Sequence, residues 1–162
     1  MGVLDPEIQT LASALLRRAL VVLLLASSLL GKAQGEILAR CELAVHLQEG
    51  GLGGFKGYSL ADWICLAYQE SKFDTMLIST NSDGSTDYGL FQINSHIWCA
   101  DHLSHSQNRC KVSCIEILNN IVAHILCAKK IVSEHSGLKY WSSWTEHCEG
   151  RDLSHWVAGC DL

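Results

Sequence analysis

The chain has 162 residues, with 12 Lys or Arg, 17 Asp or Glu and a formal net charge of −5 at pH 7. This length is enough for one domain with a hydrophobic core. The acidic balance argues against nucleic acids and anionic membrane surfaces as partners, because both attract basic proteins.

The first 35 residues predict a secretory signal peptide. Arg17 and Arg18 precede an apolar run over residues 19–30, and small residues follow up to Gly35. Basic, then apolar, then small residues is the order typical of a cleaved signal. The apolar run is shorter than the roughly 20 residues that a membrane-spanning helix needs. We therefore expect cleavage after Gly35, with retention of the leader as an anchor as the alternative.

The remaining residues, 36–162, form the predicted mature domain. They carry nine basic and 15 acidic residues, a net charge of −6. They also contain all eight cysteines, and an even number behind a signal peptide predicts four disulfides. Spacing alone does not assign the pairs. A metal site is the weaker alternative, because no Cys-x-x-Cys pair occurs and Cys110-x-x-x-Cys114 stands alone.

The N-terminal half of this domain predicts two helices and a hairpin. Residues 40–48 have helical periodicity, and the glycine-rich segment 49–54 ends that helix. Ser59 is a suitable N-cap for a helix over residues 60–71. Residues 78–95 predict a hairpin, with Asn-Ser-Asp-Gly as its turn and Tyr, Phe and Ile in the later stretch.

The C-terminal half adds a strong helix and a short one. Residues 120–132 place Ile121, Ile125, Ala128 and Val132 on one stripe, which is the pattern of an amphipathic helix. Residues 142–148 predict a short helix. Several helices and one small antiparallel sheet make the expected fold class α+β.

Two carboxyl groups in unlike surroundings, Glu70 and Asp87, are the strongest candidates for chemistry. Glu70 shares a helix face with Trp63 and lies near the helix C-terminus, so burial and the macrodipole should both raise the pKa of Glu70. Asp87 lies in a polar hairpin with Asn81 and Asn94 nearby, whose amides can donate to a charged carboxylate. A protonated acid beside a charged carboxylate suits glycosidic-bond cleavage. The alternative is an ordinary surface glutamate and a turn aspartate.

The sequence predicts no metal ion and no cofactor. The segment Asp83-x-Ser85-x-Asp87 is similar to the start of a calcium loop, but the glycine and glutamate expected further along that loop are missing. His102 and His105 lack a cysteine or carboxylate frame, so we expect exposed loop histidines there.

The tryptophans have two interpretations. In a small domain they usually belong to the core. Flat apolar rings also stack on sugar faces, so three of them are candidates for a sugar groove: Trp98, Trp141 and Trp144.

Several specific motifs lie along residues 36–162: Cys41-Glu-Leu-Ala, Gly57-Tyr-Ser-Leu-Ala-Asp-Trp-Ile-Cys65, Glu70-Ser, Asp83-Gly-Ser-Thr-Asp-Tyr-Gly-Leu-Phe-Gln-Ile-Asn-Ser95, Cys127-Ala-Lys-Lys-Ile-Val-Ser133 and Gly137-x-x-x-Trp141-x-x-Trp144. Together with the spacing of the eight cysteines, these motifs resemble the c-type lysozyme and α-lactalbumin family. The resemblance covers essentially the whole mature domain.

The resemblance implies a two-lobed domain, with a helical lobe, a small antiparallel β-sheet lobe and a cleft between them. It implies the disulfides Cys41–Cys160, Cys65–Cys148, Cys99–Cys114 and Cys110–Cys127. It also implies that Glu70 is the general acid and Asp87 the nucleophile or stabiliser of a retaining muramidase, the division of roles known for lysozymes. Its implied substrate-binding residues are Asn81, Gln92, Asn94, Trp98, Glu134, Tyr140 and Trp141.

The expected protein is therefore a secreted, monomeric, bacteriolytic glycosidase acting on β-1,4 bonds of peptidoglycan or a related N-acetylated polysaccharide. No nucleic acid is an expected partner, and no membrane is one after signal cleavage. Two departures favour an alternative, a non-lytic sugar-binding protein in gamete recognition: Ile97 stands where lytic members usually carry an aromatic residue, and the mature domain is acidic, as in members from the male reproductive tract. A modifier of a glycosyltransferase, as α-lactalbumin is, is a further alternative, against which the intact Glu70 argues.

Overall fold

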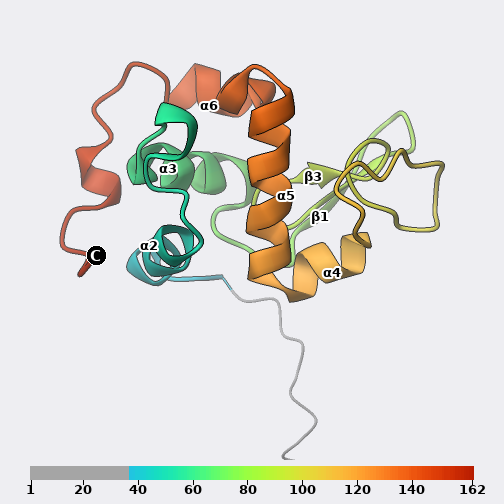
Figure 1. The fold of residues 1–162 in the computed structure, drawn as a ribbon, viewed down its shortest axis with the longest axis horizontal. Helices are drawn as coiled ribbons and strands as arrows, with labels where there is room; N and C mark the ends of the chain where they lie inside the picture. The colour runs from blue at the N-terminus through green and yellow to red at the C-terminus, as the bar shows by residue number, and fades with distance from the viewer. Residues whose placement is uncertain (1–36) are drawn as a thin grey trace, which may run out of the picture. The chain divides into compact units, whose positions relative to one another are not determined.

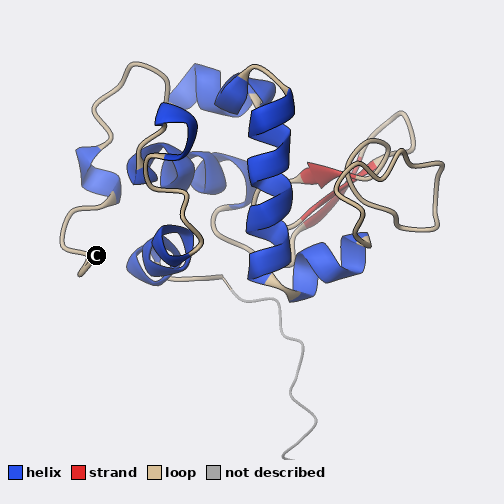
Figure 2. Ribbon diagram, in the orientation of Figure 1, coloured by secondary structure: helices blue, strands red, loops and turns tan. Residues whose placement is uncertain are grey.

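A computed structural model describes residues 37–162; the predicted leader and the cleavage site after Gly35 lie outside the described residues. The helices are α2 (Arg40–Glu49), α3 (Leu60–Ser71), α4 (Cys114–Asn119), α5 (Ile121–Glu134) and α6 (Ser142–His147), and the strands are β1 (Ile78–Thr80), β2 (Thr86–Tyr88) and β3 (Ile93–Asn94). Among the described residues, three short 3₁₀ helices complete the set: η1 (Phe55–Gly57), η2 (Gly137–Tyr140) and η3 (Ser154–Trp156). Figure 2 shows the resulting α+β fold, which confirms the predicted class.

Local sequence determines both ends of α3. The Asp62 backbone N–H donates to Ser59 Oγ (3.2 Å), and the Ser59 backbone N–H donates to Asp62 Oδ2 (2.9 Å). This reciprocal capping satisfies donors that a helix start would otherwise leave unpaired. The helix stops after Ser71, because Lys72 adopts a left-handed conformation with φ 53°. The predicted helix over residues 60–71 is therefore confirmed, and its end determines where Glu70 lies.

The three strands form an antiparallel sheet in the order β1-β2-β3. The turn between β1 and β2 is closed by the Gly84 N–H, which donates to the Asn81 carbonyl (3.1 Å), and Gly84 has φ 83°, a conformation that glycine adopts without strain. In the register of the sheet, Asp87 faces Ser79 on one side and Asn94 on the other. The predicted hairpin is thus confirmed, with Asp87 in the middle of the central strand.

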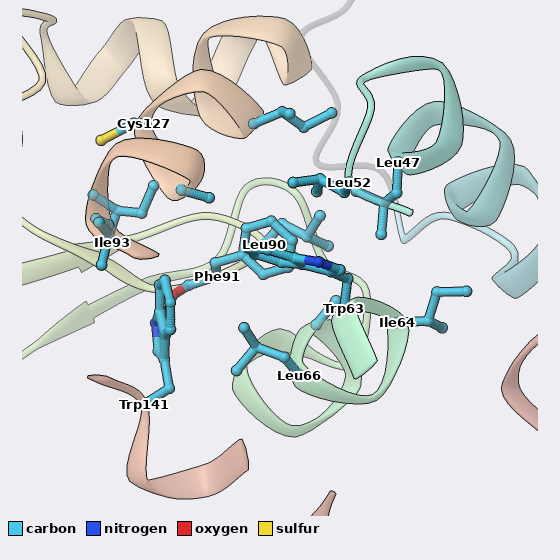
Figure 3. Packing of buried hydrophobic residues seen from close by; sticks show 14 of the residues in the cluster. Leu47, Leu52, Trp63, Ile64, Leu66, Leu90, Phe91, Ile93, Cys127 and Trp141 are labelled. Atoms are coloured by element: carbon cyan, nitrogen blue, oxygen red, sulfur yellow. The ribbon is translucent and has the colours of Figure 1, made fainter. Parts of the chain in front are cut away.

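The helix α5 lies between the two lobes. In Figure 1 the strands and the long loop that follows them lie on one side of α5, and α2, α3 and α6 lie on the other. Three of the four predicted stripe residues, Ile125, Ala128 and Val132, are at most 3% exposed. Figure 3 shows the core around Trp63 and Phe91, whose ring centroids are 5.7 Å apart. Among the described residues, no helix has the length and apolar composition needed to cross a bilayer.

Four disulfides join the pairs that the resemblance implied. Cys41–Cys160 and Cys65–Cys148 link positions 119 and 83 residues apart, and so tie the early helices to the C-terminal segment. Cys99–Cys114 and Cys110–Cys127 span only 15 and 17 residues and anchor the long loop before α4. Each closed loop restricts the unfolded chain, which is worth roughly 3–5 kcal/mol for loops of these lengths.

Candidate active site

A cleft of about 570 Å³ contains most of the predicted site residues. It is lined by Glu70, Asp83, Asp87, Gln92, Asn94, His96, Ile97, Tyr140, Trp141 and Ser142. The end of α3, the strands β2 and β3 with the turns and loop beside them, η2 and the start of α6 supply these side chains. The carboxyl groups of Glu70 and Asp87 therefore face one shared space, although they belong to different lobes. A separate cavity of about 190 Å³ beside Leu38 and His124 contains neither carboxyl group.

Asp87 is held by two amide donors. Asn81 Nδ2 donates to Asp87 Oδ2 (2.8 Å), and Asn94 Nδ2 donates to Asp87 Oδ1 (2.7 Å). Both amides also donate to Ser85 Oγ, at 3.0 and 2.8 Å. Ser85 is almost fully buried, so it fixes the orientation of both amides. This arrangement fixes the direction of the Asp87 carboxylate, and its two donors are the Asn81 and Asn94 amides that the sequence placed near it.

Glu70 has an opposite environment. Burial raises the pKa of Glu70, the charge of Asp87 raises it further, and a hydrogen bond from the Ser143 hydroxyl lowers it. Burial is the largest of these effects, so the net direction is upward. The raised pKa agrees with the expectation from the sequence. A carboxyl group with a raised pKa beside a second carboxyl group held by two amides is the kind of pair that acid catalysis and charge stabilisation use.

Ser143 provides a direct test of this balance. Its Oγ donates to Glu70 Oε1, and the bond favours the charged form of Glu70. We expect Ser143→Ala to raise the pKa of Glu70 further, because the carboxylate loses a donor while burial and Asp87 remain. A ¹³C NMR titration of the Glu70 carboxyl group measures the shift. The neighbouring Ser142→Ala, also in the cleft lining, serves as the control, and equal shifts in both variants would contradict the role of Ser143.

The aromatic wall of the cleft is supported from behind. Trp141 is 5% exposed and its Nε1–H donates to the Phe91 carbonyl (2.8 Å). The Phe91 backbone N–H in turn donates to His124 Nε2 (3.1 Å), and His124 Nδ1 lies 3.2 Å from the Ile117 carbonyl. Because Nε2 accepts a hydrogen bond, it carries no hydrogen itself. The hydrogen of the ring is therefore on Nδ1, and the ring is neutral. The wall is thus hydrogen-bonded through His124 to the end of α4.

Gln92 lines the cleft in a constrained conformation. Its Nε2 donates to the carbonyls of Leu77 (3.2 Å) and Gly89 (2.9 Å), and its φ is 47°. A positive φ is uncommon for a residue with a Cβ and persists only where the surroundings hold it. The Nε2 group of Gln92 is therefore engaged by two backbone carbonyls, one in the turn that carries Gln92 and one just before β1.

Three of the predicted substrate-binding residues do not line the cleft. Asn81 acts through Asp87, as described above. Trp98 has 0% exposure, and its Nε1–H donates to the Tyr140 hydroxyl (2.8 Å). Glu134 forms ion pairs with Arg109 (2.7 Å) and Lys130 (2.6 Å). A fully buried indole offers no face to a sugar, so this structure gives Trp98 a supporting position behind Tyr140.

The third candidate for a sugar groove, Trp144, is 5% exposed and packs edge-on against Tyr58 in the core.

Sequence reasoning missed two residues that shape the site. Ser143 lies two positions after Trp141 on a predicted short helix, so its proximity to the acid had a signal in the sequence. His124 interrupts the apolar stripe of α5 between Ile121 and Ile125, and a polar residue on a buried stripe points to an internal hydrogen-bond partner. Burial lowers the pKa of His124 to about 4, which agrees with a neutral ring.

Comparisons with known proteins agree with this geometry. The chain is 48% identical over 145 residues to "Sperm acrosome-associated protein 5" of Mus musculus, covering 89% of this chain and 91% of that one. It is 52% identical over 143 residues to "Lysozyme-like protein 6" of Homo sapiens, covering 88% and 97%. It is 48% identical over 130 residues to "Lysozyme C" of Dromaius novaehollandiae, covering 79% and 88%.

The family model that matches residues 36–160 is described as the C-type lysozyme/alpha-lactalbumin family. It covers nearly all of the residues that the structure describes, including both carboxyl groups of the cleft and all eight cysteines. The fold, the four disulfides and the extent of this match together assign the chain to the C-type lysozyme/alpha-lactalbumin family.

Proposed function

We propose that the chain is a secreted glycoside hydrolase of the muramidase type, which cleaves β-1,4 bonds between N-acetylated sugars with retention of configuration. One observation carries the proposal: the pKa of Glu70 is raised by burial, while Asp87, in the same cleft, accepts two amide hydrogen bonds. Glycosidases of this class need one protonated and one charged carboxyl group across the bond that breaks.

In the first half of the reaction, the carboxyl proton of Glu70 passes to the glycosidic oxygen as the bond to the anomeric carbon breaks. The Asp87 carboxylate attacks that carbon and forms a covalent glycosyl-enzyme. The sugar on the leaving side departs, and the proton from Glu70 becomes part of its new hydroxyl group. Asn81 and Asn94 hold both oxygens of Asp87, so its carboxylate needs little reorientation before attack.

In the second half, Glu70 is a carboxylate and accepts a proton from water. The resulting hydroxide attacks the anomeric carbon, the bond to Asp87 breaks, and Glu70 regains its proton. Two displacements at one carbon retain the configuration. The Ser143 hydroxyl, which donates to Glu70, stabilises the charged form that exists between these halves.

The direct test uses the secreted protein, recovered from the medium, and soluble oligomers of N-acetylglucosamine. We expect slow cleavage, with the β-anomer of the product appearing first in ¹H NMR spectra. Soluble oligomers suit this chain better than whole bacteria, because its predicted mature form has a net charge of −6 and cell walls are anionic. An absence of turnover with properly folded protein would contradict the proposal. The same preparation establishes whether the leader is removed after Gly35.

A second candidate is a sugar-binding protein without turnover. The burial of Trp98 and the presence of Ile97 in the lining favour it over a lytic enzyme, because both reduce the aromatic surface that would hold a long polysaccharide in place for cleavage. Relatives named for the sperm acrosome support a role of this second candidate in gamete recognition. Those names and the predicted signal peptide both support a secretory route. Binding of N-acetylglucosamine oligomers without cleavage would support this candidate, and turnover would exclude it.

A further inference from the structure

The side chain of Trp98 is completely shielded from solvent by the residues around it. Its ring lies edge-on to that of Tyr140, with centroids 5.8 Å apart, and its indole N–H donates to the Tyr140 hydroxyl at 2.8 Å. The exposed fraction of Trp98 is 0%. The polar atom of this tryptophan and the ring edge that carries it are therefore occupied by one neighbour.

Two further side chains complete the cover. The Arg109 guanidinium carbon lies 5.3 Å from the Trp98 ring centroid, and Glu134 holds Arg109 by an ion pair of 2.7 Å. His135 lies edge-on to Trp98, with ring centroids 5.3 Å apart. Trp98, Glu134 and Tyr140, all expected to bind substrate, are thus engaged in one cluster of internal contacts.

Tyr140 is the member of this cluster that faces the cleft. Its ring lies edge-on to that of Trp141, with centroids 4.9 Å apart, and both residues line the space that contains Glu70 and Asp87. An indole provides an apolar face and one N–H donor, which together match the apolar face and hydroxyl groups of a sugar. At this wall, a ligand meets the ring of Tyr140 in place of that indole.

We propose that Tyr140 is a specificity-determining residue, which covers Trp98, takes its indole N–H and so limits the cleft to short N-acetylated oligosaccharides. The proposal deepens the proposed function, since it concerns the ligand of the same site. It requires binding of the sugar in the cleft, but it does not require turnover.

The test compares Tyr140→Ala with wild type by calorimetric titration of the N-acetylglucosamine dimer and tetramer. With Trp98 uncovered, we expect about tenfold tighter binding of the tetramer and little change for the dimer. The gain is the size expected when a ligand adds one hydrogen bond and one ring contact. Tyr140→Phe keeps the ring over Trp98 and should show much less gain. The double variant Tyr140→Ala/Trp98→Phe should lose the gain, because phenylalanine has no N–H donor.

A measurement without ligand tests whether Tyr140 shields the Trp98 indole from solvent. The indole N–H of Trp98 should exchange slowly with solvent in wild type and faster in Tyr140→Ala, as seen in ¹H–¹⁵N NMR spectra. Tyr58→Ala, which removes another tyrosine packed edge-on against a tryptophan, is the matched control and should leave the Trp98 signal unchanged.

Two outcomes overturn the proposal: an indole N–H that stays protected in Tyr140→Ala, or an exposed one with no gain for the tetramer. Absence of cleavage in all variants, with the tetramer gain present, contradicts only the hydrolytic function and leaves the role of Tyr140 intact.

Discussion

Glu70→Gln should reduce the rate of oligosaccharide cleavage by about 10²–10⁴-fold, the contribution of a positioned general acid. Glutamine keeps the shape of the side chain and can still accept the hydrogen bond from Ser143, but it has no proton to give to the leaving oxygen. Affinity for the N-acetylglucosamine tetramer should change little, because the loss lies in the transition state. Initial rates and calorimetric titration of the same preparation separate the two effects.

The pH dependence of the wild-type cleavage rate also tests Glu70 as the general acid. Burial raises the pKa of Glu70, so its proton is retained to a higher pH than in an exposed glutamate. Activity should fall as the pH rises through this raised pKa, and Ser143→Ala should move that alkaline limb upward. Glu49→Gln, an exposed glutamate at the end of α2, is the control and should leave rate and profile unchanged. An equal rate for Glu70→Gln and wild type would remove Glu70 from the mechanism.

The second large effect is a loss of stability in mild acid, caused by His124. Burial lowers the pKa of His124 to about 4, whereas the unfolded chain should have the ordinary value of about 6.5. Between these values the unfolded state binds more protons than the folded state, so the free energy of unfolding falls as the pH decreases. The full contribution is present above about pH 6.5 and is lost as the pH approaches 4, a difference on the order of 3 kcal/mol.

Denaturant unfolding at a series of pH values tests this effect. His124→Gln should be less stable than wild type near pH 7, because it disturbs the bonds to Phe91 and Ile117, but its stability should depend less on pH between 6.5 and 4. Comparison with wild type isolates His124 from the carboxyl groups, including Glu70, whose raised pKa has the opposite influence. His155→Gln, at an exposed position, should keep the wild-type slope. A slope unchanged in His124→Gln would contradict the assignment.

Local signals in the sequence predicted the elements that carry the two carboxyl groups. Ser59 and Asp62 specify the start of α3 by capping, and the helical period then places Glu70 on the face of Trp63. The Asn-Ser-Asp-Gly turn joins β1 to β2 and determines the register that sets Asp87 opposite Ser79. Each of these features depends on residues that are close in the chain, which is why a sequence predicts them well.

The features that sequence reasoning missed depend on packing between distant residues. Trp98 and Tyr140 are 42 positions apart, and whether the indole faces solvent or a tyrosine hydroxyl depends on how the long loop folds against η2. Ser143 reaches Glu70 across 73 positions. Such contacts need the assembled fold. The helix α4 was missed for a different, local reason, because its six residues are too few for periodicity to separate it from a loop.

The short disulfides determine how the protein responds to proteolytic damage. Leu103, in the long loop before α4, is 76% exposed and offers an accessible bond to a protease. A cut there leaves both fragments covalently joined, since Cys99 remains bonded to Cys114 on the far side of the break. Clipped molecules would migrate as one species on a denaturing gel until a reductant is added, and would differ from intact ones only by the mass of a water molecule. Preparations for kinetic work therefore need to be assessed under reducing conditions.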